Sequence, residues 1–258
     1  MAFTYAGSLN GGAPVVREFT IGETMYTGQL AQAGITGGLA QVQIADAATD
    51  LREDDTFPLG VVTGIVDDSR AFTTSLAGTA RYGDSSTYST SQSVIKTQGP
   101  GRVQVTLAIP GITLLRAPLF NGAWGTPLAE NTILTTNAAG TSVIVTSATA
   151  DFADKYGTAY CRTGANKGVY RNISSVVTTT STITIPFPYT ITSGDKFVLC
   201  GPMLGYTGIQ IPASADCVDG NTNMADYYAV FCHELNLENA GEEYMVFSFW
   251  SGTGPEAA

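Results

Sequence analysis

The segment GVYRNISSVVTTTSTITIPFPYTITSGDKFVL, residues 168 to 199, consists largely of β-branched and aromatic residues and carries almost no charge. Such side chains favour β-strands, because they pack well on a pleated surface and lose χ1 freedom in a helix. The segment contains a Gly194-Asp195 turn and no arrangement of groups that suggests catalysis. This much sheet-forming sequence constrains the chain to a β-rich fold. We interpret the chain as a structural protein, a building block of a larger particle.

Short strand-like segments, separated by turns, occupy most of the remaining chain. In residues 102–109, RVQVTLAI, apolar residues alternate with Gln, Thr and Ala, which predicts a strand with one buried face. The segments 226–235 and 242–250 flank the loop NLENAG and predict a C-terminal hairpin that carries large aromatic side chains. Further strands are predicted at 23–30, 40–46, 57–67, 113–120, 141–146, 168–177, 181–187 and 196–200.

Only one segment favours a helix. Residues 147–157, SATADFADKYG, offer a hydroxyl cap at Ser147 or Thr149, acidic residues early in the segment and Gly157 as a stop. The predicted fold class is therefore all-β, an antiparallel β-barrel or sandwich-like domain with an inserted β module and very little helix.

The organisation along the chain has four parts. Residues 1–16 are small, polar and rich in Gly and Pro, which predicts a flexible, extended N-terminal arm without secondary structure of its own. Residues 17–139 form the first β domain, and residues 140–225 form the inserted β module. Residues 226–258 contain the hairpin that closes the fold, followed by a short flexible tail.

The charge content argues against several kinds of partner. Charged residues make up 13% of the chain, against about 25% in typical globular domains, so much of the surface is neutral and suited to being covered by neighbours. The net charge is −10, and the twelve Lys and Arg residues form no basic stripe, so no direct nucleic-acid binding is expected. Neither a secretory signal nor a long apolar run is recognised, so we expect no membrane association.

The cysteines do not predict a metal site. Cys161, Cys200, Cys217 and Cys232 include no C-x-x-C pair, and the chain has a single histidine. We predict buried, reduced thiols, with a disulfide formed after release as the alternative.

Catalytic candidates are few. His233 is the only histidine, and its neighbour Cys232 would point to the opposite face of a strand, so the two are not expected to pair. The adjacent acids Asp54-Asp55 and Asp67-Asp68 are typical of solvated turns, and a glycosidase pair is the alternative. The chain has no G-x-S-x-G, G-x-x-x-x-G-K-[ST] or H-E-x-x-H motif. We therefore predict no catalytic, cofactor-binding or metal-binding residues, no cofactor and no enzymatic activity.

One polar loop and several aromatic residues leave alternatives open. The loop DCVDGNTNMAD, residues 216–226, is expected to be an Asx-turn loop, with structural calcium as the alternative. The oxygen ligands available in the loop are Asp216, Asp219, Asn221, Asn223 and Asp226.

Three aromatic residues also leave an alternative open. The core is the expected place of Trp124, Tyr227 and Tyr228, and the alternative is an exposed platform on which sugars stack.

The order of segments within 20–135 resembles the head decoration proteins of tailed bacteriophages. The resemblance rests on GETMYTGQLAQ, then FPLGVVTGIVD, then GRVQVTLAIPGITLLRAPLFNGAWGTPL. That family has a P-x-G-V-V-like strand, a V-x-V strand, and an apolar strand that ends in a Gly-rich turn. The first of these motifs corresponds here to Pro58, Gly60, Val61 and Val62.

The resemblance implies a capsid-surface protein, often trimeric, that bridges neighbouring capsomers. The expected function is thus a capsid decoration or cementing subunit of the virion, synthesised in the host cytoplasm, whose partners are the major capsid protein and further copies of itself. The block from about residue 140 to 225 departs from decoration proteins of minimal size. The alternatives are another virion component, such as a tail, fibre or head-spike protein, and a glycan-binding adhesive β module.

Overall fold

The protein is all-β, as the sequence predicts. A computed structural model shows strands β1 to β17 arranged in three sheets, and none of the residues that it describes is helical. Accordingly, no helix in this part of the chain has the length and apolarity needed to cross a bilayer. The structure describes residues 2–21, 25–36, 39–45, 58–66, 102–122, 124–144, 157–177, 180–212, 216–220 and 228–250.

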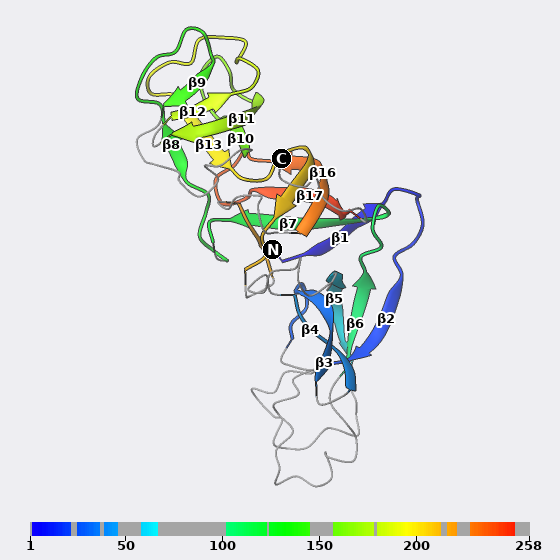
Figure 1. Cartoon of the computed structure of the whole chain (residues 1–258). Coiled ribbons are helices and arrows are strands. Elements are labelled where there is room, and N and C mark those ends of the chain that lie inside the picture. The colour runs from blue at the N-terminus through cyan, green and yellow to red at the C-terminus, as the bar shows by residue number, and fades with distance from the viewer. Residues whose placement is uncertain are drawn as a thin grey trace.

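The central sheet is built from both ends of the chain and from its middle (Figure 1). Its neighbouring strands are antiparallel, and only the short strand β15 (Val218–Asp219) is added in parallel to β7. The predicted C-terminal hairpin is confirmed as the adjacent strands β16 and β17. In spatial order the strands are β1 (Thr4–Ser8), β7 (Thr113–Phe120), β17 (Tyr244–Phe249), β16 (Tyr228–Asn236) and β14 (Gly205–Ile209).

Two further sheets lie at opposite ends of the central sheet (Figure 1). One is five-stranded, in the order β2 (Val16–Thr20), β6 (Arg102–Leu107), β5 (Pro58–Val66), β3 (Leu30–Thr36) and β4 (Leu39–Ile44). The other, which we call the module sheet, is six-stranded. Its order is β8 (Glu130–Thr132), β13 (Lys196–Cys200), β10 (Gly157–Cys161), β11 (Tyr170–Val177), β12 (Thr180–Ile183) and β9 (Ser142–Ile144).

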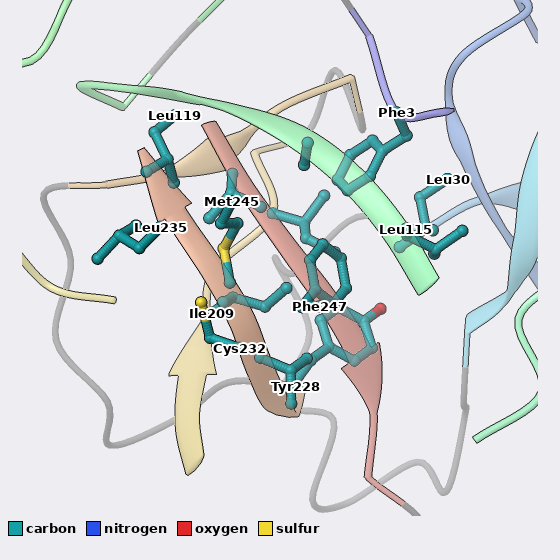
Figure 2. Packing of buried hydrophobic residues seen from close by; sticks show 14 of the residues in the cluster. Phe3, Leu30, Leu115, Leu119, Ile209, Tyr228, Cys232, Leu235, Met245 and Phe247 are labelled. Atoms are coloured by element: carbon teal, nitrogen blue, oxygen red, sulfur yellow. The ribbon is translucent and has the colours of Figure 1, made fainter. Parts of the chain in front are cut away.

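The largest hydrophobic core lies on the inner face of the central sheet, where Leu115 and Phe247 pack (Figure 2), and it receives side chains from all three sheets. Leu115 and Phe247 belong to the central sheet, Leu30 comes from the five-stranded sheet, and Val198 comes from the module sheet. Each outer sheet also has a separate apolar cluster of its own. The central sheet is therefore the element against which the other two are packed.

Gly60 has a steric reason to be a glycine in the PLGVV segment. A Cβ atom at this position would lie 2.0 Å from the carbonyl oxygen of Thr106 on the adjacent strand β6. Because that oxygen belongs to the backbone of a paired strand, it cannot move aside as a flexible side chain would. The close approach of β5 and β6 thus depends on this glycine.

The prediction that residues 1–16 form an arm without secondary structure is wrong, because part of this segment is a strand of the central sheet and Phe3 beside it is a core residue. Thr4–Ser8 form β1, which pairs with β7, and the side chain of Phe3 is only 1% exposed. Phe3 packs edge-on against Phe247, with ring centroids 6.3 Å apart. The open edge of β7 provides hydrogen-bond partners that outweigh the weak local preference of a Gly-rich segment.

Two other local predictions have different outcomes. Residues 23 and 24 of the strand predicted at 23–30 lie outside the described residues, and the prediction is wrong for 25–29: residues 26–29 form a turn, in which Gln29 N–H donates to the Tyr26 carbonyl oxygen, and the strand begins at Leu30. Gly28, with φ +85°, supplies the left-handed conformation within that turn. Residues 147–156 of the predicted helix lie outside the described residues, and Gly157 opens strand β10.

Candidate functional site on the outer face of the central sheet

The central sheet has one buried face and one face that is partly open. Along β16, Val230 and Cys232 are buried while Phe231 and His233 are exposed, as expected for side chains that alternate across a strand. The prediction that Cys232 and His233 lie on opposite faces is thus confirmed. We call the partly open face, which carries Phe231 and His233, the outer face. It has two features.

The first feature, which we call the aromatic strip, consists of Tyr206, Phe231, His233 and Trp250. Tyr206 on β14 is paired directly with Phe231 on β16. The rings of Phe231 and Trp250 lie within 29° of parallel at 6.5 Å, and Tyr206 meets Trp250 edge-on at 6.2 Å. Phe231 is 37% exposed and Trp250 43% exposed. The strip is therefore a contiguous aromatic surface at one end of the outer face.

The strip borders an edge of the central sheet. Strand β14 pairs with β16 and is the last strand in the order of the central sheet as described, and Gln210, directly after β14, forms an antiparallel bridge with Asp219 of β15. Unpaired N–H and C=O groups on an edge strand are a template for pairing with another chain. The aromatic strip thus lies at the outermost strand of the central sheet in the part of the chain that the structure describes.

His233 is held within the strip by a hydrogen bond. Its Nε2 lies 2.9 Å from Oγ of Ser248, at a β-bulge between Cys232 and Glu234. Burial lowers the pKa of His233 below its ordinary value, so the imidazole is neutral near pH 7. A catalytic triad needs a third group that orients the histidine, and no carboxylate of the described residues hydrogen bonds to His233. The His233–Ser248 contact could not be predicted from the sequence, because it depends on the register of β16 and β17.

The lowered pKa of His233 makes a testable prediction. The unfolded chain binds the proton more readily than the folded one, so the free energy of unfolding should fall as the pH drops below the unfolded value of about 6.5. Above that pH the protonation of this histidine should no longer change the free energy of unfolding. Because it is the only histidine, its imidazole proton resonances can be followed by NMR without ambiguity. Phe231→Ala, which exposes the ring, should raise the pKa toward 6.5, whereas a wild-type pKa at or above 6.5 would contradict the assignment.

The second feature, which we call the outer pocket, lies at the other end of the same face. It is a cavity of about 80 Å³. The guanidinium carbon of Arg116 lies 3.7 Å from the centre of the Tyr244 ring. The Tyr244 hydroxyl donates to Glu234 Oε1 at 2.6 Å, and this hydrogen bond raises the pKa of Tyr244. The cavity is lined by Ala2, Thr4, Arg116, Pro118, Phe120, Gly241, Glu242, Glu243 and Tyr244.

Arg116 differs from the other arginines on the described strands. Arg102 pairs with Glu18, and Arg171 donates to backbone carbonyl oxygens. The guanidinium of Arg116 lies over the ring of Tyr244. It forms no hydrogen bond or ion pair with any residue that the structure describes. A half-buried guanidinium with free N–H donors beside a cavity is suited to binding a ligand that carries acceptors.

Glu243, which also lines the outer pocket, has its charge compensated from the module sheet. Its Oε1 lies 2.5 Å from Nη2 of Arg162, and its Oε2 accepts a hydrogen bond from Gly241 N–H at 2.7 Å. Nε of Arg162 donates to the Leu237 carbonyl oxygen at 2.9 Å. The Glu243 and Arg162 side chains are 0% and 6% exposed. Nη1 of Arg162 also lies 3.4 Å from Oε2 of the partly exposed Glu130. The contact between Arg162 and Glu243, which we call the Arg162 bridge, joins the residue that follows strand β10 to the β16–β17 hairpin.

The four cysteines are buried and form no disulfide, which confirms the predicted reduced thiols. Burial raises the pKa of Cys161 and Cys232 to about 12 and also raises the pKa of Cys200. Thiols with such pKa values stay protonated at neutral pH and are poor nucleophiles. They are therefore packing residues of the core.

The candidate calcium loop and the acidic pairs are only partly described. The carboxylate of Asp219 accepts a hydrogen bond from Gly122 N–H at 3.0 Å and so connects two loops. Among the residues with described positions, no group of His, Cys, Asp or Glu could hold a metal ion. Asn221, Asn223 and Asp226, as well as Asp54-Asp55 and Asp67-Asp68, lie outside the described residues.

The three aromatic residues considered from sequence have different positions. Trp124 is 43% exposed and packs on Phe120, with ring centroids 5.1 Å apart, so the core expectation is wrong for this residue. Tyr228 is buried against Phe249, as expected for a core residue. Tyr227 lies outside the described residues. Phe120 lines the outer pocket, so Trp124 stands next to that pocket.

Comparisons of the chain with protein-family models, with curated proteins and with solved structures gave no match. A function must therefore be inferred from the residues and from the geometry of the outer face.

Proposed function

We propose that this chain is a capsid decoration subunit of a tailed bacteriophage, which binds the outer surface of the shell and stabilises it. The observation that carries the proposal is the aromatic strip beside the edge strand β14. The assignment to a phage head comes from the sequence resemblance within residues 20–135. In this proposal the protein is not an enzyme, and its partners are the major capsid protein and further copies of itself.

The aromatic strip has the chemistry of a protein–protein interface. Tyr and Trp are enriched among the residues that contribute most to binding, because they bury a large area at a low cost in side-chain entropy. A contiguous exposed aromatic surface on a chain with only 13% charged residues lowers the solubility of a free subunit. Burial of the strip in an assembly removes that disadvantage.

Strand pairing at the edge of β14 would fix the orientation of a neighbouring subunit in this contact. A strand of a neighbouring subunit can pair with the edge while its side chains cover Tyr206 and Phe231. Stable attachment requires about 1,000 Å² or more of total buried area. Attachment to the assembled shell, and not to free capsid subunits, stabilises the shell by mass action.

Such a contact depends little on charge, so the bound protein should resist added salt. The resemblance suggests a homo-oligomer, with a trimer as the expected state, located on the virion surface after synthesis in the host cytoplasm. The predicted role of residues 1–16 as an attachment arm is replaced here by the strip, because Phe3 and β1 are part of the folded core.

The test is a double variant, Phe231→Ser with Trp250→Ser, compared with the exposed control Ile185→Ser on the module. We expect wild-type protein and control to form oligomers in light scattering, to remain on shells at high salt, and to raise the temperature at which shells rupture. The double variant should be monomeric and should detach, with an unchanged melting temperature as evidence of folding. Retention of the double variant at the wild-type level would contradict the strip as the interface, and undecorated shells of equal robustness would contradict the decoration role.

A further inference from the structure

We infer that the outer pocket is a carbohydrate-binding site that takes a terminal, uncharged sugar unit of a glycan. This function is separate from the assembly role of the aromatic strip. From Tyr244 in the pocket to Trp250 in the strip the chain advances by six residues, which is about 20 Å at ~3.3 Å per residue. A neighbour that covers the strip therefore leaves room for a ligand at the pocket.

Arg116 supplies the hydrogen-bond donors. Its guanidinium carbon lies over the Tyr244 ring at 3.7 Å from the ring centre, a contact that positions the group without the use of any N–H group. The Tyr244 ring is fixed in turn by its hydrogen bond to Glu234. The result is a preoriented planar donor whose N–H groups are free to bind hydroxyl or carbonyl oxygens of a ligand.

The acceptors in the same cavity select for an uncharged ligand. Glu242 is exposed and has received one hydrogen bond, from Asn239 Nδ2 at 3.1 Å, which leaves further lone pairs. The hydroxyl of Thr4 can donate or accept. One arginine therefore faces Glu242 and the compensated Glu243 in a chain of net charge −10, which is unfavourable for a phosphate or carboxylate. Sugar hydroxyls, which both donate and accept, can use both kinds of group.

The apolar lining matches the other face of a sugar ring. Pro118 and Phe120 line the cavity with apolar groups, and sugars place their C–H faces on apolar and aromatic surfaces. Trp124 continues this surface outward through its contact with Phe120 at 5.1 Å, and it is exposed. The cavity of about 80 Å³ is much smaller than the ~300–1,000 Å³ of typical small-molecule sites. It thus suits one terminal unit, with the next unit of the chain placed on Trp124.

The experiment uses the full-length protein on an array of neutral and acidic oligosaccharides, followed by calorimetric titration with the neutral oligosaccharide that binds best and with its terminal monosaccharide. Arg116→Met should weaken binding of both at least tenfold. Trp124→Ala should weaken the oligosaccharide about tenfold and leave the monosaccharide unchanged. Tyr189→Ala, an exposed aromatic residue on the module, is the matched control and should bind as wild type.

Three outcomes would overturn the inference: no binding on the array, binding restricted to acidic glycans, or equal binding by wild type and Trp124→Ala with the oligosaccharide. Trp124 is exposed, so its replacement leaves the fold intact and the test does not depend on the stability of the Arg116 variant. These results are independent of shell attachment, which the strip variant measures.

Discussion

Replacement of Glu243 by alanine is expected to destabilise the protein by up to about 3–5 kcal/mol, because it removes the buried anionic partner of Arg162 and leaves only the partly exposed Glu130, whose Oε2 lies 3.4 Å from Nη1 of Arg162. The Glu243 and Arg162 side chains are 0% and 6% exposed, and their atoms Oε1 and Nη2 are 2.5 Å apart. Water cannot replace the lost carboxylate at such a position without opening the contact between β10 and the β16–β17 hairpin. Chemical denaturation monitored by tryptophan fluorescence measures the change.

A double variant separates the cost of an unpaired charge from the value of the pair itself. Arg162→Met with Glu243→Leu removes both charges and keeps apolar volume, so it should recover most of the stability lost in Glu243→Ala. Arg102→Met is the control: its guanidinium lies 3.1 Å from Glu18, and the two side chains are 41% and 45% exposed. A partly exposed pair of this kind contributes about 0–1 kcal/mol. A loss below about 1 kcal/mol for Glu243→Ala would show that the Arg162 bridge is not buried as described.

Replacement of Phe3 by alanine is expected to cost about 3–5 kcal/mol, the range for removal of a buried aromatic side chain from a core. Phe3 is 1% exposed and packs on Phe247 in the central core, and its backbone N–H donates to the Gly28 carbonyl oxygen at 2.9 Å. Deletion of residues 2–14 removes this side chain and also the pairing of β1 with β7. The deletion should therefore destabilise the protein more than Phe3→Ala does.

Thermal and chemical unfolding of these variants measures the effect, with Leu9→Ala as the matched control. Leu9 follows β1 directly and is 55% exposed, so its replacement should change the free energy of unfolding by less than about 0.5 kcal/mol. A melting temperature unaffected by the deletion would restore the alternative of a detachable arm. In that case residues 1–16, and not the aromatic strip, would be the first candidate for attachment to the shell.

The sequence by itself determined the all-β class and the position of several strands. Residues 113–120 were predicted and observed as a strand, and the hairpin of β16 and β17 was predicted from its apolar alternation and its Asn- and Gly-containing loop. These features follow from local causes: side chains of period two, β-branched residues and turn residues. The burial of the four cysteines follows equally from their apolar character.

The tertiary structure alone decided how these strands are combined and which side chains meet. Phe3 and β1 became core elements because β7 has an edge to pair, a property that no local pattern reveals. Arg162 and Glu243 are 81 residues apart in sequence, and Arg116 reaches Tyr244 only through the register between β7 and β17. A shift of one residue in that register would move every outer side chain of the strand to the inner face. The strip and the outer pocket exist because strands distant in sequence were brought into one particular register, which is set by burial of the opposite face.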